Sequence, residues 1–414
     1  MRDLVSRMKC KAGVLGLGKV GKNLLLRQIH GSDHFRIHWV SDSKRVYRVN
    51  RQSGFTGQDC KKIIKFKQTH TAFPEIPKCE IYEFENVSQQ TKLLNDLITT
   101  DKKDWVIFDT TFTRKEDDYS IANTMMGCKA YCAGNKTAWT DYDSCDKLFR
   151  KATETQTLLG LNCTVGVWLD QMEILPIMLQ NLISGKIILL KRDNSSLNLF
   201  FEKIGSGLTV EKTILELENS GHLDLPGPDA LLTEVKDQTM KAHIAANVCG
   251  IMRSTRPVFK NQQATRPDEP KSFEAKELAE WHLRGRKHGD YPALVSEINV
   301  DTSDGMIDLE VGFAELKRGQ PLARDFVGKC AMSIDASAAK FKWSKGTRKP
   351  AQFMRSGYGG AKKTAAKLIA EANRAIIISH RKPKVCRSPI IVLAALEKGE
   401  QAAKLLDRKL RLAL

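Results

Sequence analysis

The residues best suited to chemistry begin with a glycine-rich turn at 16–21, which reads Gly-Leu-Gly-Lys-Val-Gly. The turn follows an apolar run at 12–15 and opens an amphipathic stretch at 20–29, so it joins an expected strand to an expected helix. In that context the first glycine permits a tight turn, the second lets a pyrophosphate approach the backbone, and the third lets helix and strand pack closely. The unpaired N–H groups of the new helix then face the phosphates. The residues expected to bind a dinucleotide here are Gly16, Gly18, Lys19, Val20 and Gly21.

The next chemical feature is an acid at the end of the second expected strand. Asp42 lies 21 residues beyond Gly21, where an acid binds the adenosine ribose hydroxyls of NAD. Lys44 and Arg45 follow two and three residues later, and such a pair of cations can neutralise the 2′-phosphate of NADP. The sequence therefore predicts a dinucleotide cofactor and leaves both NAD and NADP open. The structural alternative is a glycine-rich turn followed by a solvated charge cluster.

The elements that must position these residues alternate between strand and helix, which is typical of a mostly parallel sheet with helices on both faces. Segment 50–88 breaks this alternation and is expected to be an irregular insertion with one short strand around Ile81. From about Thr164 the pattern changes to that of a second, α+β domain, with a surface loop or linker at 257–270. Expected strands cover 12–15, 36–41, 105–111, 129–133, 158–163, 293–300 and 306–315. Expected helices cover 20–29, 117–126, 143–154, 170–183, 209–219 and 231–249.

Length and charge limit the function classes. A chain of 414 residues is too long for one hydrophobic core, and its net charge of +18 calls for a test of anionic partners: nucleic acid, a membrane surface or a phosphate-bearing cofactor. A net charge of +13 lies between Ala336 and Arg387 alone. No run approaches the roughly 18–20 apolar residues of a membrane span, so no membrane association is expected. Ten cysteines without a CxxC pair, and an N-terminus without a signal or transit pattern, favour a cytoplasmic protein with reduced thiols.

Four further landmarks, in order along nearly the whole chain, resemble the homoserine dehydrogenase family. They are Phe-Asp-Thr-Thr at 108–111, Ala-Gly-Asn-Lys-Thr-Ala at 133–138, Cys-Thr-Val-Gly at 163–166 and Gly-Tyr-Gly-Gly-Ala at 357–361. The resemblance implies an α/β fold in which a Rossmann-type dinucleotide-binding domain at 1–163 is followed by an α+β catalytic and dimerisation domain at 164–345. A basic C-terminal segment at 346–414 would then return a helix to the first domain.

The resemblance also implies a reaction. Family members transfer a hydride reversibly between a nicotinamide and the C4 carbonyl of aspartate semialdehyde to give homoserine, a step of threonine and methionine biosynthesis. Such a reaction needs a cation beside the reacting oxygen and a proton source. Lys136 and Lys241 align with the family's lysines, and Asp237, four residues before Lys241, aligns with the acid beside that lysine. Taken alone, these residues would be a solvated loop lysine and a surface ion pair.

The other implied site residues bind cofactor, substrate or a monovalent cation. For the cofactor they are Thr110, Thr111, Asn135 and Gly360; for the amino-acid substrate, Thr164, Ser196, Asp224 and Asp229; for the cation, the backbone carbonyls of Val165 and Val167. A homodimer is implied as well.

Several family positions differ, and they cluster around substrate recognition. Asn162 stands where the family has a glutamate that helps to bind the cation, and the loop from Asp224 to Asp229 has altered spacing. The family's Gly-Thr-x-Asn strand corresponds to 194–198, which has lost the glycine. A different small amino or hydroxy acid therefore stays open as the substrate. So does a non-catalytic Rossmann scaffold whose basic stretch binds nucleic acid, although few aromatic residues accompany that charge.

Overall fold

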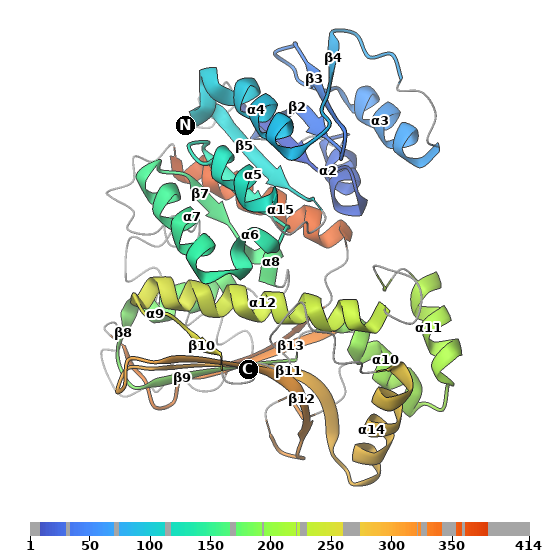
Figure 1. The fold of residues 1–414 in the computed structure, drawn as a ribbon, viewed down its shortest axis with the longest axis vertical. Helices are drawn as coiled ribbons and strands as arrows, with labels where there is room; N and C mark the ends of the chain where they lie inside the picture. The colour runs from blue at the N-terminus through green and yellow to red at the C-terminus, as the bar shows by residue number, and fades with distance from the viewer. Residues whose placement is uncertain are drawn as a thin grey trace. The chain divides into compact units, whose positions relative to one another are not determined.

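The structure of the chain is a computed structural model (Figure 1). Its polypeptide divides into two compact units, and the second is inserted into the first: unit 1 comprises Met1–Val167 and Gly360–Glu397, and unit 2 comprises Trp168–Gly359 and Lys398–Leu414. The structure describes residues 9–29, 34–69, 74–111, 117–165, 171–192, 194–220, 222–223, 230–259, 274–320, 322–323, 329–341, 353–357 and 361–379.

Unit 1 is built on a seven-stranded sheet of order β4-β3-β2-β1-β5-β6-β7. Strands β2, β1, β5, β6 and β7 are parallel, as expected, whereas β3 and β4 run antiparallel at one edge. The strands are β1 (Cys10–Leu15), β2 (Phe35–Ser41), β3 (Arg45–Val49), β4 (Cys79–Glu83), β5 (Trp105–Asp109), β6 (Ala130–Ala133) and β7 (Leu158–Gly160). The helices are α2 (Lys19–Ile29), α3 (Gly57–Thr69), α4 (Val87–Ile98), the 3₁₀ helix η1 (Thr99–Asp104), α5 (Asp117–Met125), α6 (Thr137–Thr140), α7 (Tyr142–Glu154), α8 (Asn162–Val165) and α15 (Ala361–Ser379).

The expectation of an irregular insertion at 50–88 was wrong for much of that segment. It contains helix α3, and it also contains the expected strand around Ile81, which is β4. The helix begins with a reciprocal cap: the amide and hydroxyl of Thr56 donate to Asp59 Oδ2, and the amide of Asp59 donates to Thr56 Oγ1. Cys60, Ile63 and Ile64 then bury one face at helical spacing. The lysines and glutamines of this segment, which suggested a loop, lie on the rest of the surface of the amphipathic helix α3.

A second correction concerns 158–163, which was expected to be a single strand. Strand β7 ends at Gly160, and helix α8 begins at Asn162. The break coincides with a long-range contact, because the amide N and Nδ2 of Asn162 donate to Glu371 Oε1 of α15 at 3.1 and 2.9 Å. The Glu371 carboxylate thus accepts hydrogen bonds from both the backbone and the side chain of Asn162. In a continuing strand, that backbone amide would have been paired within the sheet instead.

Helix α15 fulfils the expectation that a C-terminal helix returns to the first domain. In Figure 1 it is the orange-red helix among the elements of unit 1, and it contacts α2, α8, β6 and β7. Its Leu368 and Ala372 are fully buried in the same core as Leu24 of α2 and Ile63 of α3. Burial of this apolar face, at about 25 cal/mol per Å², supplies the free energy that holds the helix on the sheet.

Unit 2 contains a six-stranded, mostly antiparallel sheet of order β10-β12-β11-β9-β13-β15, as expected for an α+β domain. The long helix α12 packs against β11, β12 and α9 (Figure 1). Helix α14, strand β9 and strand β13 were not anticipated. The strands are β8 (Leu182–Ser184), β9 (Lys186–Arg192), β10 (Val258–Phe259), β11 (Tyr291–Asp301), β12 (Ile307–Leu316), β13 (Cys330–Asp335), β14 (Lys340–Phe341) and β15 (Phe353–Gly357). The helices are α9 (Gln171–Asn181), α10 (Ser195–Gly205), α11 (Val210–Asn219), α12 (Ala230–Arg253) and α14 (Ala275–Lys287).

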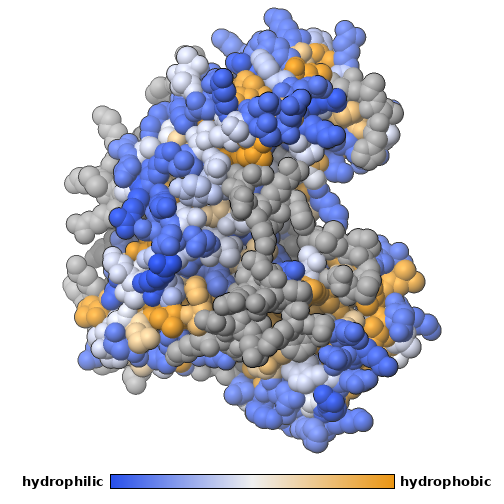
Figure 2. All heavy atoms as spheres, viewed as in Figure 1, coloured by the Kyte–Doolittle hydropathy of each residue, from blue (hydrophilic) through white to orange (hydrophobic). Residues whose placement is uncertain are grey.

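On the face drawn in Figure 2, hydrophilic residues (blue) predominate among the described residues, and the apolar patches (orange) are smaller. No helix in the described part of the chain is long and apolar enough to cross a membrane. Of the fourteen Lys and Arg residues between Ala336 and Arg387, six belong to the described residues and eight lie outside them.

The centre of the unit 1 sheet generates a prediction about stability. A Cβ atom added to Gly13 of β1 would lie 2.0 Å from Cζ2 of Trp39, which is fully buried on β2. We expect Gly13→Ala to lower the free energy of unfolding by about 1–3 kcal/mol, because a rigid indole must move to admit the methyl group. Urea denaturation measures this. Gly18→Ala is the matched control, because no atom lies within 4 Å of its added Cβ; equal stability of the two variants would contradict the packing.

Candidate functional site

The glycine turn between β1 and α2 has the shape that a dinucleotide requires. Gly16 has a φ of +86°, and a Cβ there would lie 2.7 Å from the carbonyl oxygen of Thr110. A Cβ on Gly21 would lie 2.0 Å from the carbonyl oxygen of Gly16, so helix and turn are in close contact. Gly18 is different, because it is exposed and has no neighbour within 4 Å of its added Cβ. The two flanking glycines therefore permit close packing, and the middle one leaves open backbone for a pyrophosphate. The turn fits the cofactor that its sequence predicts.

Strand order places this turn where ligands bind in open α/β sheets. The chain leaves β1 toward β2 on one side, while β5 lies on the other side and leads to β6. Such a reversal forms a crevice at the carboxyl ends of the strands. Thr110, just after β5, joins the two sides: its amide donates to Leu15 O at 2.8 Å, and its hydroxyl contacts Leu15 O and Gly16 O at 2.8 and 2.7 Å.

The expected residues after β5 and β6 are brought together at the same edge of the sheet. Asn135 Nδ2 donates to Thr111 Oγ1 at 2.8 Å, and Asn135 Oδ1 accepts from the amide of Thr137 at 2.9 Å. Lys136, between Asn135 and Thr137, is half-buried at the N-cap position of α6. Thr110, Thr111, Asn135 and Lys136 thus form one group beside the glycine turn.

Two residues next to this group, Asp109 and Tyr131, were missed as site residues. Asp109 ends β5 and is 2% exposed; its Oδ1 accepts from the amide and hydroxyl of Thr111 at 3.1 and 2.6 Å. Its Oδ2 accepts from the hydroxyl of Tyr131, which is fully buried on β6. Burial raises the pKa of Asp109, while the hydrogen bonds from Thr111 and Tyr131 act to lower it. The sequence signal was the aspartate directly before two threonines, but Tyr131 is brought to it only by pairing of β5 with β6.

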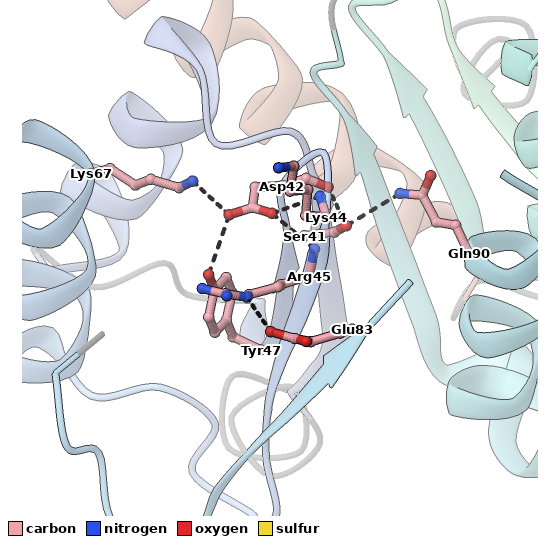
Figure 3. A network of polar contacts seen from close by, with 8 residues as sticks. All are labelled: Ser41, Asp42, Lys44, Arg45, Tyr47, Lys67, Glu83 and Gln90. Carbon is pink, nitrogen blue, oxygen red and sulfur yellow. Dashed lines mark hydrogen bonds and ion pairs between the residues drawn. The ribbon is translucent and has the colours of Figure 1, made fainter. Parts of the chain in front are cut away.

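The acid after β2 does not project into solvent but lies at the centre of a polar network (Figure 3). Asp42 Oδ1 accepts from the amides of Lys44 and Arg45, both at 2.9 Å, which closes the turn into β3. Asp42 Oδ2 accepts from Tyr47 Oη at 3.2 Å and from Lys67 Nζ at 2.5 Å. Only 13% of the Asp42 side chain and 22% of the Lys67 side chain is exposed, so the pair is partly desolvated.

The contacts of Asp42 and Tyr47 in this network shift the pKa values of both groups. Burial acts to raise the pKa of Asp42, but hydrogen bonds from Lys67 and from the amides of Lys44 and Arg45 outweigh it and lower the pKa. Burial and the Asp42 charge raise the pKa of Tyr47 to about 12, so its hydroxyl remains a donor at neutral pH. Arg45 Nε is bound to Glu83 Oε1 of β4 at 2.7 Å, whereas the Lys44 side chain is exposed. Sequence reasoning missed Lys67 because it is 25 residues from Asp42 and reaches it from α3.

Helix α15 and helix α8 add to the same edge of unit 1. Cys163 Sγ contacts Thr364 O at 3.6 Å, near the start of α15. Burial and the Glu371 carboxylate raise the pKa of the Cys163 thiol, while Lys367 and Lys136 act to lower it. Thr164 is fully buried, and its hydroxyl donates to Leu161 O at 2.6 Å. Val165 is buried as well, whereas Val167 and Gly360 lie outside the described residues.

In unit 2 the two expected catalytic residues form an ion pair on α12. Lys241 Nζ lies 2.6 Å from Asp237 Oδ2, one helical turn earlier, with side chains 17% and 21% exposed. Such partial burial makes the pair more strongly coupled than an exposed i,i+4 pair, which contributes about 0.3–0.5 kcal/mol.

The expected substrate residues of unit 2 are placed less completely. Segment 194–198 differs from the family's strand because it starts helix α10: Asn194 Oδ1 accepts from the amide of Leu197 at 2.8 Å and caps the helix. Ser196 is 5% exposed, and its hydroxyl donates to His222 O at 2.7 Å. Asp224 and Asp229 lie outside the described residues. In the part of the chain that the structure describes, no group of three or more His, Cys, Asp or Glu side chains is placed to hold a metal ion.

Comparison with solved structures decides the fold. A hyperthermophilic archaeal homoserine dehydrogenase in complex with NADPH superposes with a TM-score of 0.61 at 16% identity, over 89% of this chain and 98% of the other. The chain has the homoserine dehydrogenase fold. A homoserine dehydrogenase from Thermoplasma acidophilum gives a TM-score of 0.57 at 15% identity, over 90% and 99% of the two chains. A Candida auris protein of unknown function gives 0.61 at 17%, also over 90% and 99%.

The homoserine dehydrogenase fold confirms the expected α/β architecture of a Rossmann-type domain with an added α+β domain. The likeness is one of structure: no protein-family model matches the sequence, and no curated protein matches it either. At such identity the fold is shared, while the site residues must be argued from their own contacts.

The open space beside Gly18 predicts that a substitution at this position weakens dinucleotide binding without lowering the stability of the fold. We expect Gly18→Ala to weaken dinucleotide binding at least about tenfold, because the methyl group would occupy the approach to the backbone amides. The melting temperature should stay within about 2 °C of the wild-type value, since nothing lies within 4 Å of the added atom. Fluorescence titration with NADPH and a thermal scan measure both. Unchanged affinity would place the pyrophosphate elsewhere.

Proposed function

We propose that this protein is an NAD(P)-dependent homoserine dehydrogenase, which interconverts L-homoserine and L-aspartate 4-semialdehyde by hydride transfer. The observation that carries the proposal is the group formed by Thr110, Thr111, Asn135 and Lys136 at the carboxyl ends of β5 and β6, in hydrogen-bond contact with the glycine turn. The shared fold supports it. A dinucleotide-binding turn and a lysine-bearing turn on adjacent strands are what a nicotinamide-dependent dehydrogenase requires.

The residues of unit 1 bind and orient. The amides at the start of α2 would hold the pyrophosphate beside the open backbone at Gly18, and Thr110 fixes the turn by its bonds to Leu15 O and Gly16 O. The Asn135 side chain is hydrogen-bonded to Thr111 and to the amide of Thr137 at the start of α6. These bonds fix the direction in which Lys136 extends from the sheet. A bound nicotinamide supplies or accepts the hydride in such enzymes.

The lysines manage charge and protons. As a carbonyl is reduced, negative charge builds on its oxygen, and a nearby ammonium group stabilises that charge and can donate a proton. Lys136 in unit 1 and Lys241 in unit 2 are the candidates, and Asp237 orients the Lys241 ammonium by direct contact at 2.6 Å. We assign Thr164, Ser196, Asp224 and Asp229 to substrate binding, and the carbonyls of Val165 and Val167 to a monovalent cation, on the resemblance alone.

For the cofactor we propose NADP over NAD. The Asp42 carboxylate, which would repel a 2′-phosphate, is paired with Lys67 and hydrogen-bonded to Tyr47 (Figure 3). The exposed Lys44 follows in the same turn. A 2′-phosphate would therefore meet a neutralised acid and lysine ammonium groups. The NADPH bound to the archaeal homoserine dehydrogenase is consistent with this choice.

A second candidate substrate remains: another small amino or hydroxy acid. The altered loop at 224–229 and the helical start at 194–198 favour it, since both differ from the family's pattern. A homodimer and a cytoplasmic location complete the proposal.

The activity prediction uses paired lysine variants. We expect Lys136→Ala and Lys241→Ala to lower kcat about a hundredfold or more while NADPH affinity survives, given typical acid–base contributions. Lys147→Ala and Lys212→Ala, which remove exposed lysines of α7 and α11, are the matched controls and should retain full activity. The assay follows nicotinamide absorbance with homoserine and NADP or NAD at alkaline pH. Full activity of a Lys136 or Lys241 variant would remove that lysine from the mechanism.

The same assay separates the candidate substrates. Turnover of another amino or hydroxy acid, with none of homoserine, would replace the proposed substrate by the second candidate. Absence of nucleotide binding, together with tight and strongly salt-dependent binding of duplex DNA, would favour the non-catalytic scaffold instead.

The cofactor proposal predicts that Lys67→Ala shifts preference toward NAD. Loss of the ammonium group removes a phosphate partner and frees the Asp42 carboxylate for ribose hydroxyls, so the ratio of the Kd for NADP to the Kd for NAD should rise about tenfold. Lys65→Ala on the same helix removes the same charge from an exposed position and is the control. A constant ratio in Lys67→Ala would show that the 2′-phosphate does not meet this network.

A further inference from the structure

Asp109 is a buried acid at the point of the sheet where the two halves of the fold diverge. It ends β5, and its sheet neighbours are Leu15 of β1 and Ala133 of β6. The next residue, Thr110, is hydrogen-bonded to the glycine turn, and Asp109 O accepts from the amide of Gly134 at 2.7 Å, two residues before Lys136. The carboxylate therefore lies between the pyrophosphate turn and the lysine-bearing turn.

Hydrogen-bond directions around Asp109 can be assigned by elimination. The amide of Thr137 has only a hydrogen to offer, so Asn135 Oδ1 faces it and Asn135 Nδ2 must donate to Thr111 Oγ1. The Thr111 hydroxyl therefore gives its single hydrogen to Asp109 Oδ1, which also accepts from the Thr111 amide. With Tyr131 donating to Oδ2, three donors converge on one carboxyl group. All three hydrogens come from its neighbours, so these bonds favour the carboxylate form and oppose the burial, which raises the pKa of Asp109.

Among the residues that the structure describes, the Asp109 carboxylate accepts hydrogen bonds from neutral donors but forms no ion pair. Asp59 and Asp42 of the same unit are each held by a cationic side chain, Arg51 and Lys67 respectively. A buried charge that lacks a counter-ion is costly, and the burial of Asp109 is nearly complete at 2% exposure. The cost is offset when a positive charge arrives nearby in a low-dielectric interior.

A nicotinamide ring changes its charge with its oxidation state. The oxidised ring is a cation and the reduced ring is neutral, so a fixed anion at this edge of the sheet attracts only the oxidised form. We propose that Asp109, held by Thr111 and Tyr131, is an electrostatic determinant that makes the cofactor site bind oxidised NADP more tightly, relative to NADPH, than it otherwise would. The inference rests on the proposed function, because it requires the dinucleotide to bind across β1 and β5.

The test compares affinities rather than turnover. Kd values for NADP and NADPH are measured by calorimetry in the wild-type protein and in Asp109→Asn, which keeps the side-chain shape and removes the charge. We expect the ratio of the NADP to the NADPH dissociation constant to rise about tenfold, through loss of NADP affinity. A role confined to holding the Thr111 turn would weaken both forms equally and leave the ratio unchanged.

Asp59→Asn is the matched control, because it removes another buried carboxylate of unit 1 that lies at the start of α3. Its ratio should equal that of the wild type; an equal rise there would overturn the inference. If Asp109→Asn does not fold, the double variant Asp109→Leu with Tyr131→Phe removes the charge together with a donor, and the same rise in ratio is expected.

The measured affinities distinguish a failure of the Asp109 proposal from a failure of the proposed dehydrogenase function. If the wild type binds both nucleotide forms and the Asp109 variants keep its ratio, the inference is wrong and the proposed dehydrogenase stands. If the wild type binds neither form, the proposed function fails and the inference fails with it.

Discussion

The contact between Gly16 and Thr110 is the constraint on which the nucleotide half of this fold depends. The turn after β1 approaches the segment after β5 so closely that no side chain fits between them, and the Thr110 hydroxyl contacts both Leu15 O and Gly16 O. Helix α2 must then start directly over the turn, since Gly21 lies against Gly16. From that junction follow the exposure of Gly18, the placement of Asp109 and Thr111, and, through Asn135, the direction of Lys136.

The two acids at the carboxyl edge of this sheet, Asp42 and Asp109, are stabilised by different kinds of partner. Asp42 is neutralised by Lys67, whereas Asp109 is stabilised by hydroxyl and amide dipoles alone among the described residues. The positive charge of the whole chain, +18, says nothing about either acid. What matters for a bound nucleotide is the local balance at each end of its site, which depends on single partners at distances of a few ångström.

Features with short-range signals were predictable from the sequence, and those made by distant pairs were not. The glycine turn, the strands around it and the α12 pair of Asp237 and Lys241 follow from spacing of a few residues. Helix α3 carried an overlooked local signal, the Thr-x-x-Asp cap. Lys67 and Tyr131 carried none, because each reaches its aspartate only after α3 has packed or β6 has paired. Asp224 and Asp229, which were expected to bind the substrate, lie outside the described residues.

The insertion of unit 2 into unit 1 has a consequence for biosynthesis. Asn162 and Glu371, whose hydrogen bonds tie α8 to α15, are 209 residues apart, and the whole of the described part of unit 2 is translated between them. A chain emerging from the ribosome therefore carries seven sheet strands whose covering helix does not yet exist. The buried face of α2 that later meets α15 stays exposed during that interval. Chaperone demand should accordingly be greatest before α15 has been made.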